Sequence, residues 1–161
     1  FVYDSKINIT IMELYVEVCL SPMMTEIDKK ITNIIKSAVQ LSPMEVFKNL
    51  QAGDILFVDS THAVKTGSDV NYILFDILPA LNNGVLIHFH DIFYPFEYPK
   101  EWVFRGFGWN EAYFLKAFLM NNNKFEIKFF TDYLHVHHQA SFNEMALAVQ
   151  GSGSSLWIEK K

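Results

Sequence analysis

Apolar and polar positions along the chain predict short strands separated by helices. Residues 6–13 alternate between the two kinds and end on Glu13, which is typical of a strand with one buried face. Residues 54–59 and 85–90 are almost continuously apolar, as in the buried strands of a parallel sheet. Shorter strands are predicted at residues 32–37, 125–131 and 156–158.

Helix start signals lie between the predicted strands. Ser68 precedes a segment whose apolar residues recur at helical spacing, and it is predicted to cap a helix over residues 69–81. Ser42, with Glu45 three residues later, has the form of a capping box for a helix that ends near Leu50. Further helices are predicted over residues 22–30, over 110–120 with Asn110 as the cap, and over 145–149.

The predicted strands and helices alternate along the whole sequence. This order is typical of an α/β fold, in which a mostly parallel sheet carries helices on both faces. No repeat or low-complexity block divides the chain, so we expect a single domain over residues 1–161.

Composition narrows the class of protein. Hydrophobic residues make up 50% of the chain and aromatic residues 16%, which argues against disorder. The formal charge of −5 argues against a nucleic-acid partner, because such a partner requires a basic surface. No apolar run reaches the roughly 18 residues of a membrane-spanning helix, and the lone Cys19 fits a reducing compartment. We therefore expect a cytoplasmic protein, without a membrane partner, that acts on a small molecule.

Ionisable residues close three of the predicted strands. The first ends at Glu13, the third at Asp59 with His62 shortly after it, and the fourth at His90 and Asp91. In open parallel α/β sheets, ligands bind beyond the carboxyl ends of the strands. We therefore expect these side chains to share one functional site.

Each of these residues also has a structural interpretation. Glu13 can be a solvated strand end, and Asp59 and Asp91 can accept backbone N–H bonds in turns. His62 can be a loop residue without a role. His88 lies one pleat deeper than the strand end, and we interpret it as a hydrogen-bonded core histidine.

Five stretches of the sequence are informative when taken together: ITIMELY, AGDILFVDSTH, NNGVLIHFHDIFYPFEYPKEWV, WNEAYFLKAFL and SSLWI. In combination they resemble the class I S-adenosylmethionine-dependent methyltransferases. The resemblance is most specific where Asp-x-x-His and His-Asp combine with a trailing F-x-P-x-x-Y-P. It implies a Rossmann-like sheet with an antiparallel C-terminal strand, and methyl transfer to an oxygen or nitrogen of a small molecule.

The resemblance also implies roles for individual residues in binding S-adenosylmethionine. Glu13 matches the acid that usually binds the ribose hydroxyls, which suits a carboxylate facing two donors. Ser37 and Ala38 match residues that usually contact the adenine. Asp59 matches the acid that lies near the transferable methyl group.

A divalent metal is the second cofactor that the resemblance raises. In metal-dependent relatives, the acid matching Asp59 joins two residues matching His90 and Asp91 to hold magnesium. A histidine in this set favours a softer divalent ion, or no metal. Without a metal, His90 or His62 is expected to be the base that removes a proton from an acceptor hydroxyl.

The aromatic segment, residues 93–109, is expected to form a loop on the substrate side, stiffened by Pro95 and Pro99. Its aromatic residues can wall a pocket or serve ordinary packing or an oligomer contact.

The chain departs from the family at its start. No glycine precedes Gly53, so the glycine-rich turn that lets the backbone approach the cofactor is not present. We therefore expect an N-terminally truncated fold, without the strand that would lie between those ending at Glu13 and Asp59. Its loss would leave open strand edges, to be closed by re-pairing, rearrangement or dimerisation, so a homo-oligomer is expected.

Two other functions remain open from the sequence. The chain can be a non-enzymatic remnant of this fold that forms oligomers or binds a small molecule. The second alternative is a metal-dependent hydrolase, because His88-x-His90-Asp91 and His137-His138 contain metal-ligating side chains. That function requires ligands from several strand ends to converge on one ion.

Overall fold

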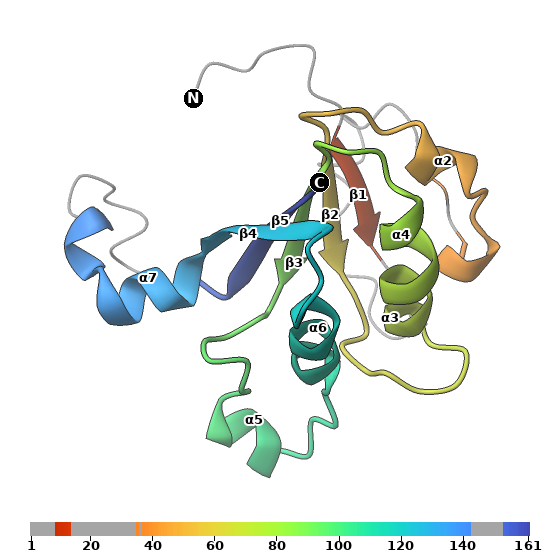
Figure 1. Ribbon diagram of the computed structural model, residues 1–161. Coiled ribbons are helices and arrows are strands. Elements are labelled where there is room, and N and C mark those ends of the chain that lie inside the picture. Colours follow the sequence, from red (N-terminus) through yellow and green to blue (C-terminus); the bar gives the residue numbers. More distant parts are fainter. Residues whose placement is uncertain (1–8, 14–34, 36, 143–152) are drawn as a thin grey trace, which may run out of the picture.

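The structure is a computed structural model that describes residues 9–13, 35, 37–142 and 153–161 (Figure 1). It confirms the α/β class, with a mixed open sheet flanked by helices. The strands are β1 (Ile9–Glu13), β2 (Ile55–Asp59), β3 (Leu86–His90), β4 (Phe125–Phe130) and β5 (Ser155–Lys160). The helical elements are η1 (Val39–Leu41), α2 (Glu45–Lys48), α3 (Asp69–Tyr72), η2 (Ile73–Ile77), α4 (Leu78–Ala80), α5 (Lys100–Phe104), α6 (Glu111–Leu119), α7 (Thr131–His137) and η3 (Gln139–Phe142).

The sheet has the strand order β1-β2-β3-β5-β4. β1, β2 and β3 pair in parallel, and the β1–β2 register places Glu13 opposite Asp59. β5 is antiparallel to both of its neighbours, which confirms the expected antiparallel C-terminal strand. The gap that we expected between the strands ending at Glu13 and Asp59 is closed, because these two strands pair directly with each other.

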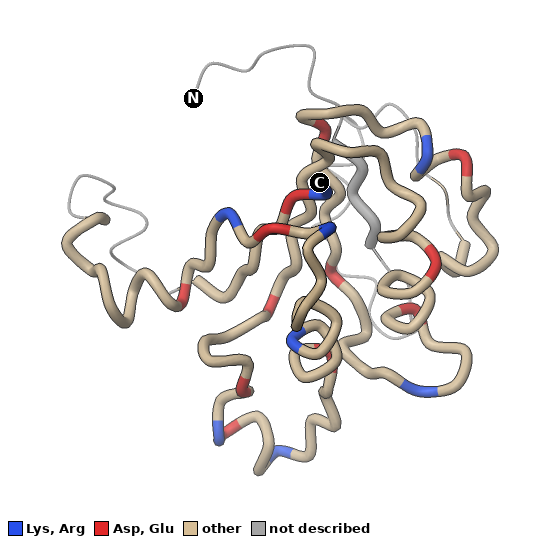
Figure 2. Tube along the Cα trace, in the orientation of Figure 1, with Lys and Arg blue, Asp and Glu red and all other residues tan. Residues whose placement is uncertain are grey.

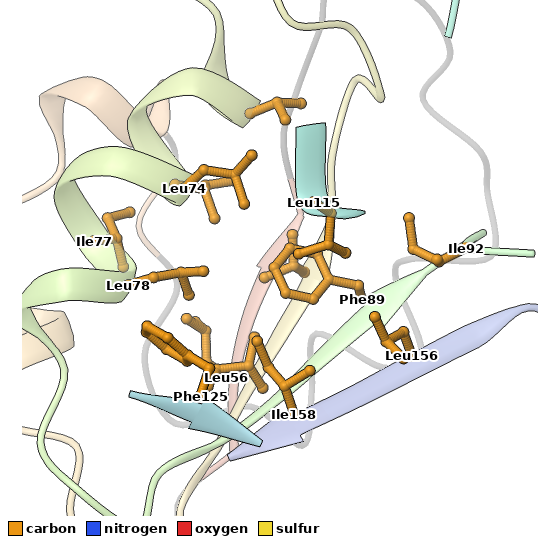
Figure 3. Packing of buried hydrophobic residues seen from close by; sticks show 14 of the residues in the cluster. Leu56, Leu74, Ile77, Leu78, Phe89, Ile92, Leu115, Phe125, Leu156 and Ile158 are labelled. Carbon is orange, nitrogen blue, oxygen red and sulfur yellow. The ribbon is translucent and has the colours of Figure 1, made fainter. Parts of the chain in front are cut away.

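One face of the sheet is deeply buried. Leu56 of β2, Phe89 of β3 and Ile158 of β5 pack against Leu74 of η2 and Leu115 of α6 (Figure 3). The strand residues that alternate with them are only partly buried, as the burial patterns of β2, β3 and β5 show. Among the described elements, α3, η2, α4 and α6 thus bury the same side of the sheet.

The predicted helix over residues 69–81 is confirmed as the continuous run α3–η2–α4. Ser68 is its cap and accepts a hydrogen bond from the backbone of Asn71 at 3.3 Å. Its middle turn, η2, is a π-helix. Pro79 lies just beyond this turn and has no N–H to give to a helical carbonyl, which explains why the regular hydrogen-bond pattern is interrupted here.

The predicted capping box at Ser42 is wrong. The Ser42 backbone N–H instead donates to Val39 at 3.1 Å and so closes the preceding turn η1, while its hydroxyl lies 3.2 Å from that of Ser37. Helix α2 begins at Glu45 without a side-chain cap.

Other predicted elements differ in part from the structure. Ile35 and Ser37, the described part of the predicted strand 32–37, lie outside any strand. The predicted helices over 22–30 and 145–149 lie outside the described residues. His135 and His137 belong to helix α7.

The outer strand β4 carries paired charges (Figure 2). Lys128 forms ion pairs with Glu126 at 2.7 Å and with Glu159 of β5 at 2.6 Å, and Lys161 also pairs with Glu126. Charges on an outer strand hinder pairing with a further strand. In the described part of the chain, no helix is long and apolar enough to cross a membrane.

Candidate functional site

The carboxyl ends of β2 and β3 bring four of the expected site residues together. His62 Nε2 lies 3.6 Å from Asp59 Oδ1, and His90 Nδ1 lies 4.0 Å from the same oxygen. His90 Nδ1 is also 3.2 Å from Asp91 Oδ1. Glu13 is in register with Asp59 at the end of the neighbouring strand, but its side chain is outside the described structure. We call Asp59, His62, His90 and Asp91 the rim cluster.

His62 is the most enclosed member of the rim cluster, at 4% exposure. Its Nδ1 lies 2.7 Å from Oε2 of the buried Glu111, and the ring of Trp109 covers it at a centroid distance of 4.1 Å. Its backbone carbonyl accepts N–H bonds from Asn110 and Glu111, at 2.9 and 3.1 Å. The start of α6 therefore holds both the ring and the backbone of His62.

The charges around His62 decide its protonation. Burial by itself would lower the pKa of this imidazole, but the contacts with Asp59 and Glu111 and the charges of Glu111 and Asp91 outweigh it and raise the pKa to about 9. His62 is therefore mainly an imidazolium at neutral pH. In this state it is a hydrogen-bond donor and has no lone pair with which to remove a proton.

His90 and Asp91 form a second close pair. The contact with Asp91 raises the pKa of His90. Although burial acts to raise the pKa of Asp91, His90 and the hydroxyl of Ser154 together lower it. Ser154 donates to Asp91 Oδ1 at 2.7 Å, so the turn before β5 is tied to the end of β3.

Two members of the rim cluster have left-handed backbones. The φ angle is 55° at His62 and 54° at Asp91. Such angles are uncommon outside glycine and are found where surrounding contacts enforce them. At His62 the enforcing contacts are the two N–H bonds from the start of α6, and at Asp91 they include the bond from Ser154.

The loop that carries His62 is also fixed to α3. Thr61 donates to the Asp69 carboxylate from its backbone N–H at 2.7 Å and from its hydroxyl at 2.6 Å. Asn110 brackets Val64 on the other side, accepting from its N–H at 2.5 Å and donating to its carbonyl at 3.2 Å. Asn110 is therefore not the side-chain cap of α6 that we expected.

His88 does not make the hydrogen bond that we expected. It is partly buried on the same side of the sheet as His90, against Phe57 at 4.4 Å and Trp157 at 4.6 Å between ring centroids. Its Nε2 is buried and has no hydrogen-bond partner among the described residues. Burial and the charge of His90 lower its pKa to about 4, so His88 is neutral at pH 7.

The aromatic segment is not a loop throughout, because it contains helix α5. Trp102 packs edge-on against Trp109 at 5.1 Å, and the buried hydroxyl of Tyr98 accepts the N–H of Ala112 at 3.0 Å. Trp109 contacts the rim cluster through His62. Most of the other contacts within the segment are ordinary aromatic packing.

The residues expected at the adenine precede η1, which is joined to the segment that follows β2. Ser37 and Ala38 are exposed and immediately precede η1. Gln40 of η1 donates to the carbonyl of Gly67 at 2.8 Å, in the segment that follows β2.

A divalent metal at Asp59, His90 and Asp91 stays a prediction. Among the described residues, no three His, Cys, Asp or Glu side chains are grouped so as to hold a metal ion. His90 Nδ1 lies 3.2 Å from Asp91 Oδ1 and 4.0 Å from Asp59 Oδ1, and an imidazole that binds a metal must be neutral. We derive no step through a metal.

Sequence reasoning missed Glu111, Ser154 and Asp69. Glu111 follows Asn110 in WNEAYF and was interpreted only as part of a helix start, and Ser154 lies in a turn of small residues. Glu111 is separated from His62 by 49 positions, and Ser154 from Asp91 by 63. No local pattern signals such distant pairs. Asp69 directly follows the predicted helix cap Ser68, and this position was the sequence signal available for it.

Comparisons with family models, with curated proteins and with solved structures found no match. What the chain does is therefore inferred from the geometry of the rim cluster and from the resemblance noted in the sequence.

Proposed function

We propose that this chain is a methyltransferase-type domain that uses S-adenosylmethionine to methylate an oxygen or nitrogen of a small molecule. One observation carries the proposal. The rim cluster is assembled at the carboxyl ends of two neighbouring parallel strands, and Glu13 closes the next parallel strand in register with Asp59. This is where an open α/β sheet binds its ligands.

The donor side of the proposed site involves Glu13, Ser37 and Ala38. A carboxylate at the end of β1 suits two adjacent ribose hydroxyls. When bound, S-adenosylmethionine supplies an electrophilic methyl group on its sulfonium.

Asp59 is the base in this proposal. Its side chain is 43% exposed and lies between His62 and His90. An acceptor hydroxyl would donate its hydrogen bond to Asp59, and the carboxylate would take the proton as the methyl group passes from the sulfonium sulfur to the acceptor oxygen, leaving a neutral thioether. His62 is expected to act as a fixed cation beside Asp59, because at neutral pH it already carries a proton.

Trp109 has a supporting role. Its ring covers one side of His62 and also packs against Trp102 and Phe107, at 5.1 and 5.3 Å. An apolar cover on one side of a charged ring excludes water and strengthens the electrostatic interactions beside it.

Binding and turnover test the proposal. We expect the protein to bind S-adenosylhomocysteine with a dissociation constant below about 1 mM in calorimetry, and Glu13→Gln to weaken it about tenfold through loss of a charge-assisted bond. Asp59→Asn is expected to abolish release of S-adenosylhomocysteine in the presence of a panel of hydroxyl acceptors.

The matched control is Asp76→Asn, which alters an exposed carboxylate on η2 away from the rim cluster. It is expected to leave both binding and turnover unchanged. Absence of binding to either S-adenosylmethionine or S-adenosylhomocysteine at millimolar concentration would contradict the proposal and favour a non-enzymatic remnant.

A further inference from the structure

Glu111 is an acidic residue inside the fold, at 1% exposure. Its Oε2 accepts a hydrogen bond from the Ser60 hydroxyl at 2.9 Å and lies 2.7 Å from His62 Nδ1. Its Oε1 is buried and has no hydrogen-bond partner among the described residues. A buried carboxylate is costly unless it is paired, so its retention here depends on His62 and Ser60.

The opposite edge of the same imidazole faces Asp59. With Nδ1 at Glu111, Nε2 is directed at Asp59 Oδ1, 3.6 Å away. An imidazole without a partner at Nδ1 can flip, so that Nδ1 and Nε2 exchange positions. A bond at one ring nitrogen fixes which nitrogen faces the site and whether it carries a proton.

The backbone contacts point the same way. Ser60 accepts the N–H of His62 at 2.9 Å with the hydroxyl that donates to Glu111. The carbonyl of His62 accepts from the backbone of Glu111 itself. Glu111 thus holds the left-handed turn at His62 and the ring that this turn presents.

We infer that Glu111 is a positioning residue: through His62 Nδ1 it orients the imidazole so that Nε2–H is directed at Asp59. The inference rests on the proposed function for its purpose, since Asp59 is the base there. The contact itself exists or fails independently of methyl transfer. The raised pKa of His62 is consistent with a ring held between Glu111 and Asp59.

The contact is tested on the wild-type protein without any ligand. Long-range proton–nitrogen correlation spectra of a nitrogen-15-labelled sample report the protonation of each histidine ring nitrogen, and His62→Gln assigns the His62 signals. At pH 7 we expect both ring nitrogens to be protonated and the Nδ1 proton to exchange slowly with water. A His62 ring whose Nδ1 proton exchanges as in a free histidine would overturn the inference.

Glu111→Gln is the decisive variant. It keeps the shape and an acceptor oxygen but removes the charge, so we expect exchange of the Nδ1 proton to accelerate at least about tenfold. The matched control is Glu97→Gln, whose exposed carboxylate accepts from Tyr113 of the same helix at 2.9 Å. The control is expected to leave the His62 signals unchanged. A thermal melt measured in parallel separates loss of folding from loss of the contact.

Turnover supplies a second readout. In the proposed reaction, Glu111→Gln is expected to lower kcat about 10- to 100-fold with KM changed less than about twofold, the range typical of residues that orient a functional side chain. The double variant with His62→Gln is expected to be no slower than the worse single variant. Fully additive losses would overturn the positioning role.

The two proposals fail separately. A slowly exchanging Nδ1 proton without any cofactor binding would leave the contact in place and remove the methyl-transfer proposal. Cofactor binding together with a His62 Nδ1 proton that exchanges freely would leave the methyl-transfer proposal in place and remove the contact.

Discussion

His62 and His88 lie near the same strand ends and have opposite chemistry. His62 is held between carboxylates, whereas His88 lies among aromatic rings with a buried Nε2 that has no partner in the described structure. The first is charged at neutral pH and the second is not. Proximity to the site therefore does not make a histidine a candidate base, and its partners decide its role.

The low pKa of His88 predicts a loss of stability in acid. Its folded-state pKa of about 4 lies below the unfolded value of 6.5, so its contribution is present above pH 6.5 and is lost as the pH falls toward 4. Between pH 7 and pH 5 this amounts to about 1–2 kcal/mol. His88→Phe removes the group, and urea unfolding of both proteins at the two pH values measures the difference.

The wild type should therefore lose more stability than His88→Phe between pH 7 and pH 5. Equal losses in the two proteins would show that His88 is not buried in neutral form. His62 has the opposite sign, since its raised pKa gives a contribution that is lost as the pH rises from 6.5 through about 9.

The residues of the rim cluster were predictable because each closes a strand or follows one. Their partners were not, because Glu111 and Ser154 reach the cluster from segments far away in the sequence. The expected role of His62 as a base also depended on those partners. The two carboxylates beside the ring, Asp59 and the buried Glu111, change it from an acceptor to a donor.

Elements with long periodic patterns were predicted well. The stripe from Val70 to Leu81 is buried as expected, and the strands ending at Asp59 and His90 lie where the apolar runs placed them. Short signals were less reliable. Ser42 is a residue type that commonly caps helices, yet here it closes the turn before Pro43. Residue types alone cannot distinguish a helix cap from the end of a turn.

The turn between α4 and β3 offers a test at the element scale. Gly84 has a φ of 83°, and a Cβ there would lie 2.6 Å from that of Ala52. Its N–H donates to Lys160 at 2.7 Å and its carbonyl accepts from Gly53 at 2.9 Å, so this turn joins β3 to β5. Gly84→Ala is expected to destabilise the fold by more than about 1 kcal/mol.

Gly108→Ala is the matched control, because a Cβ there meets no atom within 4 Å. Its unfolding free energy is expected to stay within about 0.5 kcal/mol of the wild type. Chemical denaturation of the three proteins gives the comparison, and equal stability of Gly84→Ala and Gly108→Ala would contradict the close packing at this turn.

At the scale of the whole molecule, the sheet closes without the strand that the resemblance would place between β1 and β2. Their direct parallel pairing brings Glu13 beside Asp59, and thereby brings the expected ribose acid to the rim cluster. Closure by re-pairing means that this gap does not require a second copy of the chain. A homo-oligomer stays a prediction, for which sedimentation is the direct measurement.

The most direct measurement is a chemical-shift titration of the labelled protein with S-adenosylhomocysteine. We predict saturable shifts of the backbone signals at the carboxyl ends of β1, β2 and β3, with the signals of α7 unchanged. Shifts confined to α7 or to the far ends of these strands, or no shifts at millimolar ligand, would contradict the assignment of the rim cluster as a methyl-transfer site.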